Sequence, residues 1–224
     1  STIVFFSNFG TAYSCRIDDI PATTGYGEPI QKRFSLKDGE RIVAAYSLDA
    51  RRIGDIGAED PESEYIPAVH AFAATSNGYS LRFSFAPFLE PSTRNGRRFA
   101  KPGKAEEVVG VVRVNGEETI IAASQKCRAM LCPVEEVNFL SGPGKGVILI
   151  KLARDDRLLG FIASRGERDL MVVETNRGAE KNISTAKYGV TGRGGRGREI
   201  QKQGYLVAIR EREVESPKTF NGNG

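Results

Sequence analysis

The chain opens on a short apolar run followed at once by a small polar turn, Ile3-Val4-Phe5-Phe6-Ser7-Asn8-Phe9-Gly10. The same order of features returns three more times, at residues 71–78, 120–127 and 170–178. The later copies are evenly spaced, because Gly78 and Cys127 are 49 residues apart and Cys127 and Gly178 are 51 apart. A period of this length is typical of proteins that stack one supersecondary unit several times.

Each repeat closes with a second apolar run, at residues 42–48, 108–114, 158–163 and 205–209. The interval from Gly10 to Gly78 is 68 residues, about 18 more than the later intervals. The excess coincides with residues 50–67, which are acidic and rich in turn formers, so we interpret this segment as an inserted loop. The predicted units span residues 1–49, 68–116, 117–166 and 167–216, with a tail at 217–224.

The repeated units are predicted to consist of β-strands. Their apolar runs are short, are bounded by turn residues and show no 3.6-residue stripe. Asn115-Gly116 is a two-residue hairpin signal between the second and third units, and Asp38-Gly39 and Pro102-Gly103 mark turns inside units. Four units of about four strands each predict an all-β fold, a single propeller-like domain over residues 1–224.

Composition excludes several classes of protein. Of the 224 residues, 40% are hydrophobic and 27% charged, as in folded globular domains, and no apolar run approaches the ~18 residues of a membrane span. Cys15, Cys127 and Cys132 form no CxxC pair, so we expect buried free thiols and no metal site. The single histidine, His70, stands in an apolar stretch and is predicted to be structural, so we assign no catalytic residue.

Each repeat carries a loop at the same position, and these loops differ in charge. Residues 91–104 of the second repeat contain five positive residues and no negative one: Arg94, Arg97, Arg98, Lys101 and Lys104. Residues 187–204 of the fourth repeat set one glutamate against five positive residues: Lys187, Arg193, Arg196, Arg198 and Lys202. The loops of the first and third repeats contain Lys32, Arg33 and Lys145. The net charge of +4 therefore hides basic loops at equivalent positions, which are predicted to line one rim and to contact phosphates.

A family resemblance lies in the residues of the first repeat, Phe6 to Pro21 with Pro29-Ile30 and Asp38-Gly39-Glu40-Arg41-Ile42-Val43. They resemble one blade of the C-terminal domain of the A subunit of bacterial type IIA topoisomerases, the family of DNA gyrase and topoisomerase IV. In the later repeats, residues 74–78 and 154–160 stand in matching places. The resemblance implies a β-pinwheel, in which propeller-like blades exchange strands and a basic outer rim bends or wraps duplex DNA.

Gyrase A subunits carry a box reading Gln-Arg-Arg-Gly-Gly-Lys-Gly in the blade that starts this domain. The nearest match here is residues 191–197, in which Arg193, Gly194, Gly195 and Gly197 agree with the box and Arg196 keeps the charge of the lysine. Thr191 and Gly192 depart from it, and this box-like loop lies in the last repeat. The resemblance therefore favours topoisomerase IV-like decatenation or relaxation over gyrase-type supercoiling.

The same resemblance implies a non-catalytic domain that presents a duplex to a cleavage core located before Ser1. The implied partners are double-stranded DNA, the remainder of the A subunit and the ATPase B subunit. No cofactor is expected in this domain, and the holoenzyme is expected to use ATP and Mg²⁺. We also expect an isolated domain that is monomeric, cytoplasmic and nucleoid-associated, without membrane contact.

Two other functions fit the same repeats. A propeller-like protein-interaction module would use its blade faces or the acidic segment 50–67 to bind another protein. An enzyme acting on a small molecule would need a convergent polar pocket among the blades. A salt-dependent shift of a DNA fragment by the domain separates DNA binding from protein binding.

Overall fold

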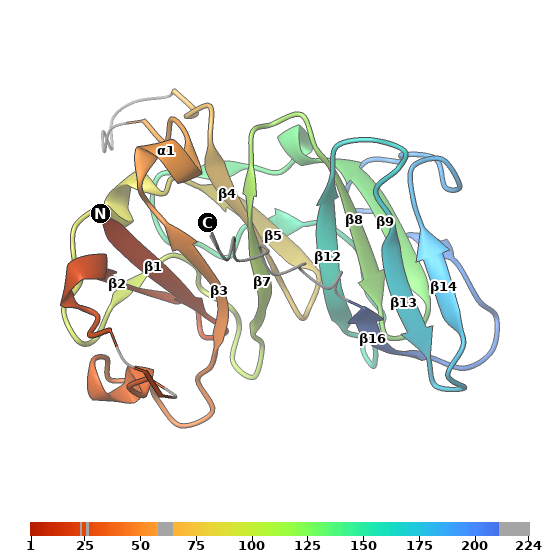
Figure 1. The fold of residues 1–224 in the computed structure, drawn as a ribbon. Coiled ribbons are helices and arrows are strands. Elements are labelled where there is room, and N and C mark those ends of the chain that lie inside the picture. Colours follow the sequence, from red (N-terminus) through yellow and green to blue (C-terminus); the bar gives the residue numbers. More distant parts are fainter. Residues whose placement is uncertain (23, 26, 58–64, 211–224) are drawn as a thin grey trace, which may run out of the picture.

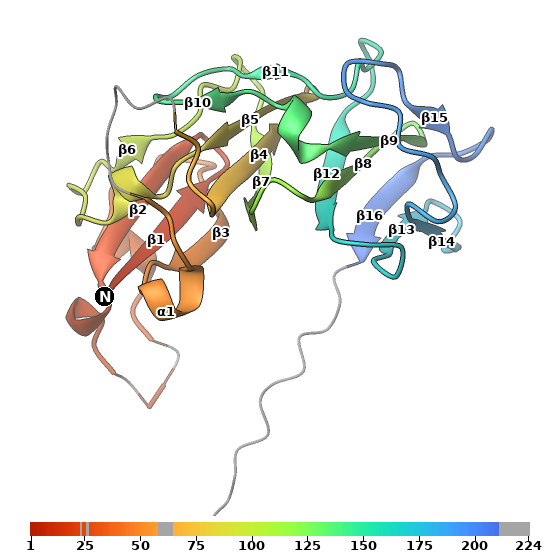
Figure 2. The same ribbon diagram turned by 90° about the horizontal axis from the view of Figure 1, so that it is seen from above.

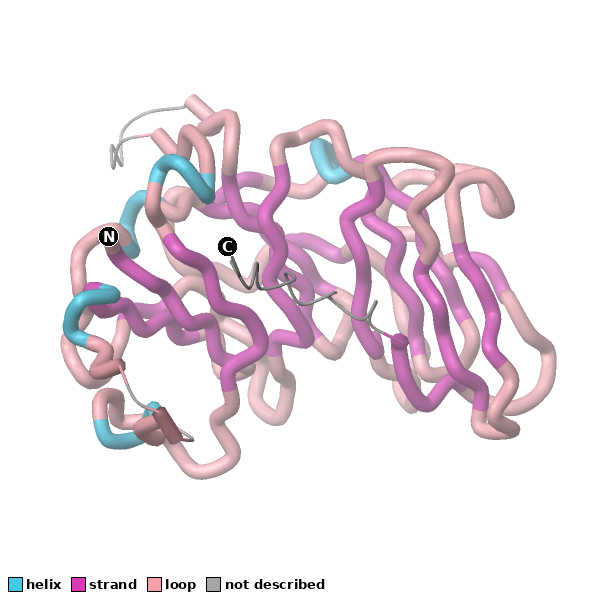
Figure 3. The backbone as a smooth tube through the Cα atoms, in the orientation of Figure 1, coloured by secondary structure: helices cyan, strands magenta, loops and turns pink. Residues whose placement is uncertain are grey.

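The computed structural model describes residues 1–22, 24–25, 27–57 and 65–210. Strands and loops make up almost all of this structure, and the helical segments are short (Figure 3). The strands form four sheets, which we call blades 1 to 4 in sequence order. The prediction of an all-β fold with four blades is confirmed.

Each blade is one sheet with an inner edge strand and an outer edge strand, and its strand order is counted from the inner edge. Blade 1 has the order β3 (Ile42–Ser47), β1 (Thr2–Ser7), β2 (Thr11–Arg16) and β6 (Arg97–Arg98). Blade 2 has the order β7 (Val108–Val114), β4 (His70–Thr75), β5 (Tyr79–Phe83) and β10 (Phe139–Leu140), and β11 (Val147–Ile148) also pairs with β5. Blade 3 has the order β12 (Leu158–Ser164), β8 (Thr119–Ser124), β9 (Arg128–Pro133) and β15 (Arg198–Glu199). Blade 4 has the order β16 (Leu206–Arg210), β13 (Met171–Thr175) and β14 (Glu180–Ile183).

The outer strand of blades 1 to 3 comes from the following repeat. β6 belongs to the second repeat but pairs antiparallel with β2, with Arg98 opposite Thr11 and Arg97 opposite Ala12. In the same way β10 and β11 of the third repeat pair with β5, and β15 of the fourth repeat pairs with β9. The blades are therefore completed by strand exchange, and blade 4 has three strands within the described residues.

The first hairpin turn of each blade confirms the alignment of the repeats. Gly10, Gly78 and Gly178 occupy the left-handed region with φ of 78°, 83° and 77°, and the aligned residue of blade 3, Cys127, has φ of 60°. Glycine adopts this conformation without steric cost, whereas a residue with a Cβ does so rarely. The turn geometry is thus kept in the third repeat although its glycine is missing.

The hairpin predicted at Asn115-Gly116 is wrong. The strands on either side, β7 and β8, belong to different blades, so this turn carries the chain from blade 2 to blade 3. The buried carboxylate of Glu118 accepts hydrogen bonds from the backbone N–H groups of Asn115 and Gly116 at 3.0 and 3.1 Å. These bonds satisfy the backbone N–H groups of the turn. The flanking strands do not pair with each other, because β7 pairs with β4 and β8 pairs with β12.

The segment interpreted as an inserted loop begins with a short helix, α1 (Ala50–Ile53). Asp49 caps it by accepting a hydrogen bond from the backbone N–H of Arg51 at 3.0 Å, and Gly54 follows with φ of 93°. Residues 58–64 of that segment lie outside the described residues, as do Tyr26, residues 211–216 of the fourth unit and the tail 217–224. Single 3₁₀ turns cover Ile17–Asp19 (η1), Ile30–Lys32 (η2), Ala86–Phe88 (η3) and Val134–Glu136 (η4).

Three hydrophobic cores lie between successive blades. In β4, Ala71 and Ala73 pack into the core shared with blade 1, while Phe72 and Ala74 pack into the core shared with blade 3. Strand β8 divides in the same way between blades 2 and 4. Successive side chains of a strand point to opposite faces, so a strand between two cores must be apolar on both. This explains why these strands are continuous apolar runs rather than alternating ones.

The inner strands β3, β7, β12 and β16 contact one another in sequence order. At each junction a residue of one hairpin turn accepts a 2.8 Å bond from the first residue of the next inner strand: Asn8 from Val108, Ser76 from Leu158 and Gln125 from Leu206. Figure 2 shows the inner strands along one edge and β6, β10, β11 and β15 along the opposite edge. Blades 1 and 4 lie at opposite ends of the described structure (Figure 1).

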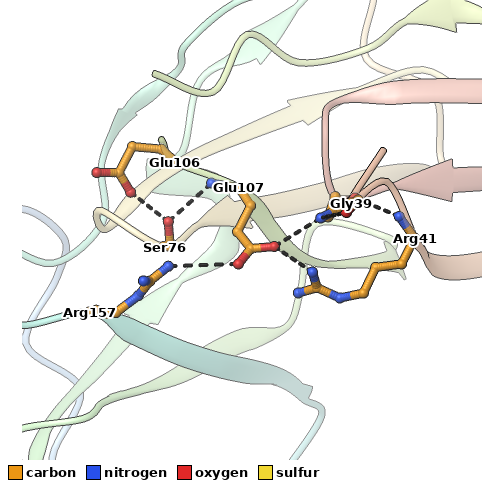
Figure 4. A network of polar contacts seen from close by, with 7 residues as sticks. Gly39, Arg41, Ser76, Glu106, Glu107 and Arg157 are labelled. Atoms are coloured by element: carbon orange, nitrogen blue, oxygen red, sulfur yellow. Dashed lines mark hydrogen bonds and ion pairs between the residues drawn. The ribbon is translucent and has the colours of Figure 1, made fainter. Parts of the chain in front are cut away.

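A polar cluster around Glu107 ties three blades together (Figure 4). Glu107 precedes the inner strand of blade 2, and its Oε2 accepts hydrogen bonds from Asn8 Nδ2 at 2.9 Å and Arg41 Nη1 at 2.7 Å, both in blade 1. Its Oε1 lies 3.7 Å from Nη2 of Arg157, which precedes the inner strand of blade 3. One carboxylate therefore bonds to blade 1 and faces a cation of blade 3.

We expect Glu107→Gln to flatten the acid side of the stability profile. The hydrogen bond from Asn8 and the ion pair with Arg41 lower the pKa of Glu107 below its ordinary value, against the opposing effect of burial. A lowered folded-state pKa stabilises the fold above the ordinary glutamate pKa, and this stabilisation is lost as the pH falls through the lowered value. Urea unfolding should show a loss of about 1 kcal/mol at pH 7 that shrinks toward pH 3. A loss that is independent of pH would contradict the assignment.

Candidate nucleic-acid interface

Three glycines fix the basic and Gly-rich loops of repeats 2 to 4 to the preceding blade. Each has a positive φ, of 67° at Gly96, 79° at Gly146 and 69° at Gly197. A Cβ at these positions would lie 2.6, 2.0 and 2.6 Å from a backbone carbonyl oxygen of the preceding blade, respectively of Ala12, Ser80 and Ala129. Only glycine lets the loop backbone approach this closely, so the three loops occupy the same place on three successive blades.

A second regularity lies five residues after these glycines, where each repeat has a lysine. Lys101 and Lys151 donate their backbone N–H groups to the carbonyls of Gly144 and Gly195 in the next loop, both at 2.8 Å. Lys202 holds the corresponding place in the fourth repeat, and all three lysines are exposed. Lys151 was not among the residues predicted to bind DNA, although its offset from Gly146 equals that of Lys101 from Gly96.

The cations predicted in the loops of repeats 2 to 4 are exposed. In the second repeat they are Arg94, Arg97, Arg98, Lys101 and Lys104, of which the middle pair forms β6. In the third repeat Lys145 lies 4.1 Å above the ring centroid of Tyr79. In the fourth repeat they are Lys187, Arg193, Arg196, Arg198 and Lys202. Exposed guanidinium and ammonium groups in these loops are suited to a polyanion, since phosphate contacts are made mainly by Arg and Lys.

Arg193 helps to hold the box-like loop in place through hydrogen bonds. Its backbone N–H and its Nε donate to the carboxylate and carbonyl of Glu136 at 2.9 and 2.8 Å, and its Nη1 donates to the carbonyl of Ile148 at 3.3 Å. Thr191 and Gly194 in the same loop donate backbone hydrogen bonds to Leu131 and Leu149, at 2.9 and 2.7 Å. The loop is therefore fastened to blades 2 and 3, and Arg193 contributes to that fastening.

The loop of the first repeat is arranged differently. Its residues Ile30–Lys32 form η2 and pair with no strand within the described residues. Lys32 Nζ lies 3.3 Å from Glu28, and Arg33 donates a hydrogen bond to the carbonyl of Asp19. The structure does not bring these two cations onto an outer strand beside the others, and their contact with DNA stays a prediction.

The single histidine and the three cysteines are buried in the fold. His70 Nδ1 lies 3.0 Å from the carbonyl of Pro67 and its Nε2 lies 3.2 Å from Arg82 Nη1, while burial lowers its pKa. Cys15, Cys127 and Cys132 are buried free thiols. Within the described part of the chain, no three His, Cys, Asp or Glu side chains gather as a metal site. No helix of that part is long and apolar enough to cross a membrane.

Four sheets, antiparallel except for the parallel pair of β10 with β5, define a propeller-like repeat domain. Three of them are completed by the following repeat, whose basic loops form a candidate polyanion interface. The family model for the DNA gyrase C-terminal domain, a beta-propeller, matches residues 1–49, 70–115 and 118–165. The chain belongs to this family, and the family resemblance seen in the sequence is confirmed.

Curated relatives point the same way. The DNA gyrase A subunit of Salmonella typhimurium is 26% identical over 189 residues, which cover 84% of this chain and 20% of that protein. The A subunit of Escherichia coli K12 is 25% identical over 197 residues, 87% of this chain and 21% of that protein. The chain thus spans about a fifth of the length of these relatives.

Solved structures share the fold. The C-terminal domain of DNA topoisomerase IV superposes with a TM-score of 0.78 at 17% identity, covering 94% of this chain and 64% of that one. The Escherichia coli ParC C-terminal domain gives a TM-score of 0.71 at 17% identity, with coverage of 93% and 80%. At these identities the comparison establishes the architecture, which confirms the propeller-like fold.

Proposed function

We propose that this domain binds duplex DNA along the edge formed by β6, β11 and β15, bends it, and presents it to the cleavage core of a type IIA topoisomerase. The observation that carries the proposal is that the three loops contact the preceding blades at equivalent positions. Gly96, Gly146 and Gly197 hold these loops in register, and Lys101, Lys151 and Lys202 repeat along them. Cations at regular intervals along one edge follow the backbone of a long duplex better than a single compact patch would.

Such binding would be mainly electrostatic and insensitive to base sequence. The loops offer Arg and Lys for phosphate oxygens but few Asn or Gln side chains to read base edges. Glycines beside the arginines let backbone amides approach the phosphates as well. Affinity should therefore fall steeply with salt, by a log–log slope of about −0.9 for each phosphate contact.

The wider setting follows from the family. We propose that the domain works beside the remainder of an A subunit and an ATPase B subunit in the bacterial cytoplasm, on nucleoid DNA, and is monomeric when isolated. We expect no cofactor in this domain and propose that other parts of the holoenzyme use ATP and Mg²⁺. Topoisomerase IV-like decatenation or relaxation is favoured, because the box-like loop departs at Thr191 and Gly192 and lies in the last repeat.

The test is a pair of substitutions in β6, Arg97→Ala with Arg98→Ala. We expect affinity for a linear duplex to fall about tenfold near 100 mM salt and the salt slope to drop by about 2, since two phosphate contacts are lost. Arg97 donates one hydrogen bond to the carbonyl of Pro87, and Arg98 donates a weak one of 3.5 Å to the carbonyl of Phe9. Arg193 is a poorer choice because its side chain holds its own loop through two hydrogen bonds. End-to-end energy transfer on a duplex of a few helical turns measures bending separately from binding.

A matched control is Arg52→Ala with Arg168→Ala. Both arginines are exposed, make no ion pair within the described residues and lie away from the proposed edge, so this variant loses the same charge. It should change affinity less than about threefold. Equal effects of the two double substitutions would mean that binding depends on net charge alone and not on the proposed edge. A duplex that binds but stays straight would rule out bending.

A further inference from the structure

A cleft with a volume of about 660 Å³ lies at the junction of blades 3 and 4. Five cations line it, Lys126, Arg128, Lys151, Arg196 and Lys202, together with two carboxylates, Asp156 and Glu199. These cations come from four separate segments: the β8–β9 hairpin, the residue after Ile150, the loop before β15 and the turn before β16. The fold thus collects positive charge from residues as far apart as positions 126 and 202.

Two of the five cations already have acidic partners. Lys126 forms an ion pair with Asp155, and Arg128 Nη2 lies 3.6 Å from Glu199. No ion pair is formed by Lys151, Arg196 or Lys202 within the described residues. Three cations that share one concave site therefore have their charge available to a ligand.

The more buried of the two carboxylates that line the cleft already has hydrogen-bond partners. Asp156 is buried, with 9% of its surface exposed, and its Oδ2 accepts a 2.7 Å hydrogen bond from Ser124 Oγ. Its Oδ1 accepts bonds from the backbone N–H groups of Lys126 and Arg157 at 2.9 and 2.8 Å. These bonds hold the turns that carry Lys126 and Arg157 and direct the carboxylate into the protein.

The junction of blades 2 and 3 has a cleft of about 470 Å³ with the opposite balance, two arginines against three carboxylates: Arg154, Arg157, Glu106, Asp155 and Asp156. By repeat alignment, Arg196 and Arg128 correspond to Lys145 and Tyr79. There the lysine lies over the tyrosine ring, 4.1 Å from its centroid, instead of joining a second cation. The basic character of the cleft at blades 3 and 4 is therefore not shared by the cleft at blades 2 and 3.

We propose that this cleft is a binding site for phosphate oxyanions, held chiefly by Lys151, Arg196 and Lys202. Two sources share this chemistry: a phosphodiester of a bound duplex and a free polyphosphate. The duplex source rests on the function proposed above, whereas the free source does not. A planar guanidinium and two flexible ammonium groups in one cleft can place several donors around one phosphate.

The experiment uses the full 224-residue chain carrying Lys151→Ala with Arg196→Ala. The first probe is inorganic tripolyphosphate, titrated by calorimetry at low salt, and the second is a linear duplex titrated at several salt concentrations. We expect each affinity to fall about tenfold or more, and the duplex salt slope to drop by about 2. The control variant Arg52→Ala with Arg168→Ala, which removes the same charge outside the cleft, should lose less than about threefold. An unchanged melting temperature of both variants shows that the fold is retained.

The two probes keep the two proposals apart. If the wild-type chain binds tripolyphosphate but not duplex, and the cleft variant loses the former, the cleft is a free-anion site and DNA binding is wrong. If the wild-type chain binds duplex and the cleft variant matches the control with both probes, DNA binding stands and the cleft assignment is overturned.

Discussion

Alanine in place of Gly146 should destabilise the protein by about 3 kcal/mol or more, measured by urea unfolding. Gly146 has φ of 79°, which costs a residue with a Cβ about 1–2 kcal/mol. The added methyl would also lie 2.0 Å from the carbonyl oxygen of Ser80 and 2.7 Å from its carbon. Neither backbone can move aside without separating β11 from β5. The variant would therefore lose pairing between repeats in addition to the backbone strain.

The same loop supplies the control. Gly142 has no positive φ, and a Cβ there would meet nothing within 4 Å. Gly142→Ala should therefore change the free energy of unfolding by less than about 0.5 kcal/mol, or raise it slightly by restricting the unfolded chain. If the two alanine variants unfolded at the same urea concentration, the close contact between the backbone of Gly146 and that of blade 2 would be contradicted.

Truncation of Phe6 should cost about 3–5 kcal/mol, the range for a fully buried phenylalanine replaced by alanine. Its ring has no exposed surface and lies at the centre of the core between blades 1 and 2. Five aromatic rings surround it with centroid distances of 5.0–6.4 Å: Phe99, Phe88, Phe83, Phe85 and Tyr46. Three of these neighbours flank β6 along the chain, Phe85 and Phe88 before it and Phe99 directly after it, so the cavity would loosen strand exchange as well as the core.

Leu170→Ala is the comparison for Phe6→Ala. Leu170 is 42% exposed and lies just before β13, so its truncation should cost less than about 1 kcal/mol. Thermal unfolding of both variants tests the difference. A similar shift in melting temperature for the two would mean that the junction of blades 1 and 2 is not the main source of stability at this end of the protein.

The repeat and its strands could be predicted because they depend on local chemistry. Short apolar runs next to turn residues indicate strands, and the spacing of Gly10, Gly78, Cys127 and Gly178 aligned the four blades, as their shared left-handed turn geometry confirms. The hairpin at Asn115-Gly116 failed for the complementary reason. An Asn-Gly dipeptide can form the turn of a hairpin or a connection between two blades. Which of the two forms depends on the strands that are available to pair nearby.

The candidate site was predicted only in part. The exposed cations of β6 and of the loop at 187–204 stand out by their density along the chain. Lys126, Arg128 and Lys151 do not, since each is a single charge in its own segment and only the fold gathers them into one cleft. Arg193 shows the converse, because an arginine inside a basic loop proves to hold that loop through Glu136 and Ile148.

By itself, the sequence determined the four repeats, their strands and the basic character of two loops, since these follow from patterns within about 50 residues. The tertiary structure alone decided which blade each loop completes, as in the pairing of Thr11 with Arg98. It also decided which cations remain available to a ligand. The physical reason is that strand exchange and charge pairing join residues distant along the chain, and their partners are selected by packing between blades rather than by local propensity.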